Sequence, residues 1–243
     1  MLNRTHWPAV WAAIATGVIA AAYVGKLPPA IPLLREEFGL SLIAAGWVNS
    51  IFNTLSVCTA AFVGVLAGRY GALRFCGAGL VAMMLGGALG AVAQGEGLLF
   101  ASRIFEGGGF IAITVSAPAL IIAACAPRER NLTLSLWASY LPIGSGLTIA
   151  VSPFLLGSIG WRGLWLAIVL LTLACVIALW RSRNDYRAAR ASAPTLSSIL
   201  PALRRLGPWW LATAFACYSL MYYALAVWLP TFLMQERGAS ITR

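Results

Sequence analysis

Charged residues are scarce in this sequence. Only 10% of its 243 residues are charged and 60% are apolar, whereas a soluble domain carries about a quarter charged and about half apolar residues. A single water-soluble globule is therefore excluded. Disorder is excluded as well, because disordered chains combine low hydrophobicity with high charge.

Side chains for metal or nucleophilic chemistry are also few. The five cysteines lie singly in apolar stretches without a CxxC pair, so they predict buried apolar positions and neither a disulfide framework nor a metal site. His6 is the one histidine, and HExxH and GxSxG motifs are absent, so we predict no enzyme and no cofactor. The one lysine, Lys26, lies in the first apolar run, which excludes a retinal protein with a Schiff-base lysine in its last helix.

Long apolar runs are what the sequence has in abundance. A helix that crosses about 30 Å of hydrocarbon needs about 20 apolar residues. The first run is too long for the apolar core of a signal peptide. The pattern therefore predicts an all-α, multi-pass transmembrane helical bundle with seven spans. Their windows between charged residues are 5–34, 38–68, 75–95, 97–127, 131–161, 163–180 and 206–235.

The net charge of +10 follows the predicted loops. With the N-terminus inside, eleven Arg and Lys residues fall on the cytoplasmic side and five outside, the bias expected of a protein in the cell (inner) membrane. Topology thus accounts for the charge with membrane lipid as the surroundings and without a nucleic-acid partner. Tryptophans near the predicted helix ends indicate an interfacial belt; they are Trp7, Trp11, Trp161, Trp165, Trp180, Trp209, Trp210 and Trp228.

One connection is long. Residues 181–206 contain six Arg and two Pro, which predicts a basic cytoplasmic linker beside anionic lipid or, alternatively, a site for a regulatory partner. The linker separates a six-helix domain, 1–180, from a seventh helix, 207–235. Within the domain, 66–71 and 155–160 share the pattern Leu-x-Gly-x-x-Gly at the ends of two helices that run in opposite directions. This pattern predicts two inverted three-helix repeats, unless it arose by chance in a chain rich in Leu and Gly.

The strongest functional candidates are Arg103 and Glu106, inside the fourth window. A charge at mid-membrane costs roughly 2.5–3.5 kcal/mol on insertion scales, so two together need a reason. Three residues apart on a helix, they can pair. Two interpretations are open: a neutralised pair that locks helices together, or a cavity-facing pair in which Arg103 attracts an anionic substrate and Glu106 carries a proton. Lys26 lies near a predicted helix end and can extend to the interface, so it is assigned no role.

Other polar candidates for substrate or proton coupling lie in other windows. Asn49 and Asn53 share one face of the second helix, and Ser139 and Tyr140 occupy a corresponding place on the fifth. Polar side chains in spans often hydrogen-bond neighbouring helices instead, so packing is the competing interpretation. Tyr222 belongs to an aromatic set on the seventh helix that either lines a cavity or faces lipid.

Taken together, these residues resemble the N-terminal half of a major facilitator superfamily transporter over nearly the whole chain. The stretch 64–74 is similar to the family signature between helices 2 and 3, with Gly68 in place of its Asp. The stretch 103–107 resembles the helix 4 signature, whose Arg is implicated in coupling, and 160–165 resembles the entry to helix 6. The matching positions are Gly64, Arg69, Gly71 and Arg74 in the gating loop and, in a degenerate Gly/Pro pattern of helix 5, Gly144, Gly146, Pro153 and Gly157.

Within the family, 103–109 followed by Pro118 and Trp137 resembles the cyanate and nitroimidazole permease branch. Family members have twelve helices in two halves around a central cavity and work by alternating access. The resemblance therefore implies a fold truncated after about seven helices, with a C-terminal half that is missing here. It also implies secondary active transport of a small organic solute or anion, coupled to protons. The alternative is a truncated, non-transporting membrane protein or scaffold.

Overall fold

The computed structural model describes residues 4–186 and 204–225, except for the side chains of residues 56–58, 60, 61, 222 and 223. All elements in these ranges are helical, which confirms the predicted all-α class. The chain divides into two compact units, Met1–Ala193 and Pro194–Arg243, and each is described by itself. The elements are α1 (Trp7–Gly25), α2 (Leu27–Phe38), α3 (Leu42–Tyr70), α4 (Ala72–Ala91), α5 (Glu96–Ala124), the 3-10 turn η1 (Pro127–Glu129), α6 (Arg130–Ala138), α7 (Tyr140–Arg181) and, in the second unit, α9 (Leu206–Tyr223).

Two helices, α1 and α2, build the first predicted span and meet at Lys26. α2 opens with Pro28 and Pro29, which are tolerated because N–H groups of a first turn have no partner within the helix. The backbone passes through Lys26 in the right-handed helical conformation, with φ −70° and ψ −27°. The two helices therefore form one stretch, Trp7–Phe38, that is long and apolar enough to cross a membrane.

Single glycines with positive φ separate successive helices. Gly39 (φ 64°) ends α2, and Gly71 (φ 91°) is the one residue between α3 and α4. Gly160 (φ 69°) interrupts α7, which is thus two helices in succession. A residue with a Cβ is strained at these φ values, so the turns require glycine. Both copies of the Leu-x-Gly-x-x-Gly pattern end on such a glycine, Gly71 and Gly160.

The predicted windows all coincide with helices, as far as the described residues extend. Four stretches have the length and apolar composition to cross a membrane, and the longest, Pro127–Arg181, contains both the fifth and the sixth window. The second window is covered by the 29-residue helix α3, of which Leu42–Leu55 is an apolar stretch of its own. α9 covers the start of the seventh window, whose remainder lies outside the described residues.

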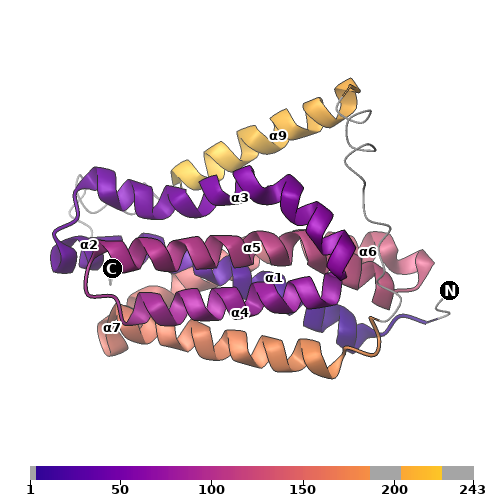
Figure 1. Cartoon of the computed structure of the whole chain (residues 1–243), viewed down its shortest axis with the longest axis horizontal. Helices are drawn as coiled ribbons and strands as arrows, with labels where there is room; N and C mark the ends of the chain where they lie inside the picture. The colour runs from indigo at the N-terminus through magenta and orange to yellow at the C-terminus, as the bar shows by residue number, and fades with distance from the viewer. Residues whose placement is uncertain (1–3, 187–203, 226–243) are drawn as a thin grey trace. The chain divides into compact units, whose positions relative to one another are not determined.

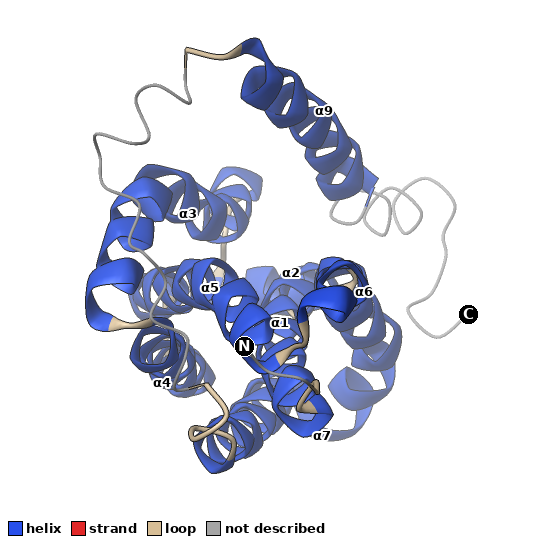
Figure 2. Ribbon diagram, turned by 90° about the vertical axis from the view of Figure 1, so that its right-hand side faces the viewer, coloured by secondary structure: helices blue, strands red, loops and turns tan. Residues whose placement is uncertain are grey.

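The long helices of the first unit pack side by side. α1, α3 and α4 all contact α5, and α7 contacts α1 and α4 (Figures 1 and 2). Glycine allows the closest approaches: a Cβ on Gly79 of α4 would lie 2.8 Å from the carbonyl oxygen of Gly109 on α5. Small residues at such crossings let helix backbones meet directly within lipid.

The predicted tryptophan belt is wrong for two of its members. Trp161 and Trp165 are only 5% and 0% exposed, because they face neighbouring helices at the start of the second half of α7. Trp11 and Trp180 are exposed, as the belt requires, at 52% and 65%. Trp228 lies outside the described residues.

The predicted burial of the cysteines is confirmed for Cys76 and Cys125, and Cys217 departs from it. Cys76 and Cys125 are buried and Cys175 is partly buried, whereas Cys217 of α9 is exposed. The large apolar side chains of α9 are exposed too, so the described residues of the second unit do not cover Cys217. The side chain of Cys58 is outside the described part of the chain.

Candidate functional site: a buried charge cluster

Three charged side chains meet in the interior of the first unit. Lys26 donates a hydrogen bond to Glu106 on α5, with 2.7 Å between Nζ and Oε1. The other carboxylate oxygen of Glu106 pairs with Arg103, one turn earlier on α5. All three side chains are at most 1% exposed. We call Lys26, Arg103 and Glu106 the charge cluster.

Aromatic rings enclose its two cations. The Lys26 Nζ lies 4.2 Å from the ring centre of Tyr23 and 4.4 Å from that of Trp165, and the Arg103 guanidinium lies 4.8 Å from the ring centre of Phe52. Ring faces attract cations, more strongly where water is excluded. The carbonyl oxygen of Tyr23 also accepts hydrogen bonds from Nη1 and Nη2 of Arg103, each at 3.4 Å. Side chains of α1, α3, α5 and α7 thus converge here.

Glycines of α4 make this convergence sterically feasible. A Cβ on Gly86 would lie 2.8 Å from Cγ and 2.9 Å from the backbone nitrogen of Glu106. A Cβ on Gly90 would lie 2.7 Å from the indole nitrogen of Trp165. Because neither position has a side chain, α5 and α7 can both approach α4 next to the charges.

The charge cluster has one positive charge in excess. Within the described residues, Glu106 is the one acid paired with Lys26 or Arg103, so two cations share one carboxylate. In the same part of the chain, Nε of Arg103 and Nε1 of Trp165 are buried donors without a hydrogen-bond partner. Buried charge is costly unless it is compensated, and buried donors are normally satisfied. The arrangement therefore suits an additional anion with several acceptor atoms.

The structure confirms the predicted pairing of Arg103 with Glu106 and corrects the interpretation of Lys26. Lys26 does not extend to the interface, because the junction of α1 and α2 lies inside the bundle and directs its ammonium to Glu106. One signal in the sequence could have identified it: Lys26 is the only charged residue in the window 5–34. Trp165 is a second residue of the site that the sequence does not indicate, because its place near a helix end predicts the interfacial belt instead.

The other polar candidates in the first unit lie on α3 and at the junction of α6 and α7. Asn49 and Asn53 are partly buried on the turns that flank Phe52, whose ring contacts Arg103. In contrast, the hydroxyl of Ser139 donates to a carbonyl of its own helical turn, at Leu136.

Of the two tyrosine candidates, the structure describes the side chain of Tyr140 but not that of Tyr222. Tyr140 stacks on Trp137 with 4.4 Å between ring centres. This pair packs against Gly17 of α1, more than two turns before Lys26. Tyr222 belongs to α9, and its side chain lies outside the described part of the chain.

The predicted gating loop is the α3–α4 junction. Gly71 forms it with its positive φ, and Arg69 and Arg74 on either side are exposed. Gly64 lies within α3, where a Cβ would have no neighbouring atom of the described residues within 4 Å. The turn therefore explains the glycine at position 71 but gives no steric reason for the one at 64.

The predicted Gly/Pro pattern likewise contains one glycine that has a steric reason and two that have none within the described residues. Gly144 of α7 faces α1, and a Cβ there would lie 2.7 Å from the Cβ of Ala21 and clash with a backbone carbonyl. A Cβ on Gly146 or Gly157 would meet no described atom within 4 Å. Pro153 is partly buried inside α7. Only Gly144 is thus required by a close helix crossing in this part of the structure.

The sequence is similar to those of known membrane transporters. The sequence profile described as Major Facilitator Superfamily matches residues 12–242. The "Probable sulfoacetate transporter SauU" of Cupriavidus necator is 26% identical over 243 residues, which cover 89% of this chain and 55% of the relative. The "Hexuronate transporter" of Bacillus subtilis is 22% identical over 252 residues, which cover 99% of this chain and 60% of the relative. The chain thus spans rather more than half the length of these two relatives.

The fold also matches a solved transporter. The xylose transporter XylE of E. coli, in a partially occluded inward open conformation, superposes with a TM-score of 0.60 at 15% identity. The match covers 89% of this chain and 59% of XylE, and at this identity it concerns the fold alone. Because the family profile matches almost the whole sequence and the helices follow the fold of a solved transporter, the chain belongs to the Major Facilitator Superfamily.

Proposed function

We propose that the protein is a secondary active transporter that moves a small organic anion together with a proton by alternating access. The observation that carries this proposal is the charge cluster, in which two buried cations share one carboxylate. Family membership supports the general class of solute transporter. Because the chain spans only part of the length of its relatives, the activity of the whole protein belongs to the proposal.

An anionic group fits the cluster both by charge and by hydrogen bonding. While Glu106 is ionised, a single negative charge would neutralise the excess positive charge; while Glu106 is protonated, the same charge would restore the net charge that the cluster had before. The planar guanidinium of Arg103 can bind two oxygens of a carboxylate or sulfonate at once, and the Lys26 ammonium adds a compact point charge. Sulfoacetate and hexuronate, which appear in the names of two relatives, are organic acids of this kind.

Glu106 supplies a route to proton coupling, because it competes with the substrate for the same donors. While ionised, its carboxylate occupies Lys26 and Arg103. A proton on Glu106 removes its charge and releases these donors, and a substrate anion can then take its place. The net charge of the cluster is the same before and after this exchange, which matters because uncompensated charge in a membrane interior is expensive. One turn of this exchange therefore carries one proton with one substrate molecule, because Glu106 is the one carboxylate that pairs with the two cations in the described part of the chain.

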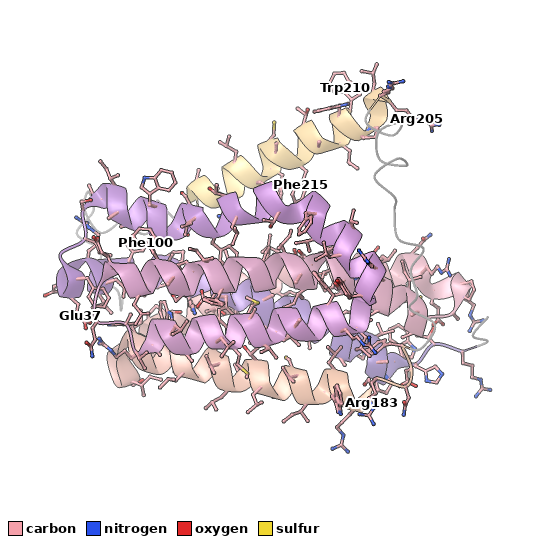
Figure 3. All side chains as sticks on the ribbon, in the orientation of Figure 1. Glu37, Phe100, Arg183, Arg205, Trp210 and Phe215 are labelled. Carbon is pink, nitrogen blue, oxygen red and sulfur yellow. The ribbon has the colours of Figure 1, made fainter. Side chains whose placement is uncertain are left out.

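We infer a cell (inner) membrane protein with a cytoplasmic N-terminus, supported by the basic predicted loops and by Glu37 and Arg183 lying at opposite ends of the first unit (Figure 3). The six helices of 1–180 form two inverted repeats, supported by the positive-φ glycines Gly71 and Gly160 at the ends of the repeated pattern. Assignment to the cyanate and nitroimidazole permease branch stays a prediction.

Uptake into proteoliposomes tests the proposal. The protein, expressed from its complete reading frame, is reconstituted with an inward proton gradient and offered radiolabelled sulfoacetate, glucuronate or cyanate, with xylose as a neutral comparator. We expect uptake of at least one anion and not of xylose. Arg103→Ala should lower anion uptake by about two orders of magnitude, because a buried charge partner is lost. Glu106→Gln should abolish accumulation driven by the proton gradient but retain exchange of anion for anion.

Glu96→Gln provides the matched control, since Glu96 is an exposed acid at the start of the same helix. It should transport like the wild type. If Arg103→Ala and Glu106→Gln also transport like the wild type, the assigned roles are wrong. If no anion accumulates but a neutral solute does, the cluster is a structural lock between helices and not a binding site.

A further inference from the structure

Trp165 contacts the charge cluster without carrying charge itself. It lies in the second half of α7, is 0% exposed, and presents its ring 4.4 Å from the Lys26 Nζ. The ring of Tyr23 lies at a similar distance from the same nitrogen, and Glu106 accepts its hydrogen bond. The Lys26 ammonium is therefore bounded by two rings and one carboxylate.

Lys26 needs such a boundary more than Arg103 does. Arg103 is on the same helix as Glu106, so the spacing along α5 already brings them together. Lys26 is at the junction of α1 and α2 and reaches Glu106 across the bundle on a flexible four-carbon stem. Its position against Glu106 thus depends on what fills the space around the stem and the ammonium.

Trp165 is itself held from one end of the bundle. Trp161 lies one turn earlier on α7 and packs edge-on against Trp165, with 5.5 Å between ring centres and 84° between ring planes. Its indole nitrogen donates to Glu37 at the end of α2, at 2.6 Å, and Glu37 also pairs with Arg162 at 2.7 Å. A continuous set of contacts therefore runs from Glu37 through Trp161 and Trp165 to Lys26.

We propose that Trp165 is a positioning residue that holds the Lys26 ammonium against Glu106, and that Trp161 anchors the Trp165 ring through its bond to Glu37. Its importance for transport rests on the proposed function, whereas its effect on Lys26 does not. The indole nitrogen of Trp165 has no partner among the described residues, so the ring face is what acts. Phenylalanine should therefore keep Lys26 in its position, and leucine should not.

The single lysine of the sequence allows a test that needs no substrate. The protein in proteoliposomes is treated briefly with acetic anhydride, and acetylation of Lys26 is followed by mass spectrometry of the tryptic peptide that then runs on to Arg35. We expect slow labelling in the wild type and in Trp165→Phe, and labelling about tenfold faster in Trp165→Leu, where the cation–π contact is lost. Trp161→Phe, which keeps a ring but loses the bond to Glu37, should fall in between.

Two controls separate a local change from unfolding. Trp180→Leu removes an exposed tryptophan from the same helix and should label like the wild type. Maleimide labelling of the buried Cys76 reports loosening of the bundle as a whole. Faster Lys26 labelling in Trp165→Leu with Cys76 still protected supports the proposal, and unchanged Lys26 labelling overturns it. If Trp165→Leu also exposes Cys76, Trp161→Phe decides: faster Lys26 labelling there supports the proposal and wild-type labelling overturns it.

Transport measurements keep this inference separate from the proposed function. If Trp165→Leu frees Lys26 but the protein moves no anion, the positioning role stands and the transport proposal fails. If anion transport is intact and Trp165→Leu raises neither Lys26 labelling nor the KM for the anion, the positioning role fails alone. A fall in kcat with an unchanged KM and unchanged labelling also contradicts it.

Discussion

Two glutamates of the first unit each pair with an arginine, but in opposite surroundings. Glu106 pairs with Arg103 and Lys26 and is 0% exposed. Glu37, at one end of the bundle (Figure 3), pairs with Arg162 and accepts a hydrogen bond from Trp161, and its side chain is 39% exposed. At Glu37 one acid meets one base within reach of water, whereas at Glu106 one acid meets two bases away from water.

This difference separates a structural contact from a candidate for chemistry. Exposed ion pairs are worth little because water and salt compete with them. In a buried cluster, removing one partner leaves the others charged without compensation, and that cost is large. The excess charge next to Glu106 can change only if an ion or a proton enters, which is the event that a transporter couples to movement. The balanced pair at Glu37 has no such need.

The same substitution at both glutamates should reveal this contrast. Glu106→Gln should lower the free energy of unfolding by about 3–5 kcal/mol, because two buried cations lose their anion. Thermal unfolding in detergent micelles measures the change. Added sulfoacetate or glucuronate should restore part of the lost stability, since an anion can replace the carboxylate. A Glu106→Gln protein as stable as the wild type would remove the distinction between the two sites.

Substitution of Gly86, which packs against Glu106, should lower the stability by an intermediate amount. In Gly86→Ala the new Cβ would lie 2.7 Å from the carbonyl oxygen of Ser102 and 2.9 Å from the nitrogen of Glu106, so α4 must move away from α5. We expect a loss of about 1–3 kcal/mol in unfolding free energy, typical of overpacking, and slower anion uptake. Gly77→Ala on the same helix is the control, because a Cβ there meets no described atom within 4 Å. Equal stability of the two variants would contradict the close approach.

The smallest loss of stability is expected at Glu37. Glu37→Gln should cost about 0.2–1 kcal/mol, the usual range for an exposed pair, and the difference from the wild type should shrink as salt is raised. Thermal unfolding at low and at high ionic strength measures it. A loss at Glu37 as large as that at Glu106, or one independent of salt, would show that burial is not what distinguishes the sites.

Contacts within one helix could be predicted from the sequence, whereas contacts between helices could not. Arg103 and Glu106 pair as predicted because three residues along a helix bring side chains to one face. Analogy of position predicts Ser139 and Tyr140 as further candidates, and in the structure they contact Leu136 and Trp137 of their own segment. Analogy of position reports where a residue lies along a span and carries no information on which neighbour its face meets.

The sequence by itself determined the lipid surroundings and the approximate extent of the helices, because long apolar runs must be helical in lipid. The structure decided where helices meet inside a run, as α1 and α2 do at Lys26. Only the tertiary structure decided that Lys26 pairs with Glu106, 80 residues away. It also decided that the Trp165 ring packs against the Lys26 ammonium and does not lie at the membrane interface. The physical reason is that helix periodicity is a property of one segment. Which faces of different helices meet depends on their rotation and on where small residues let them approach.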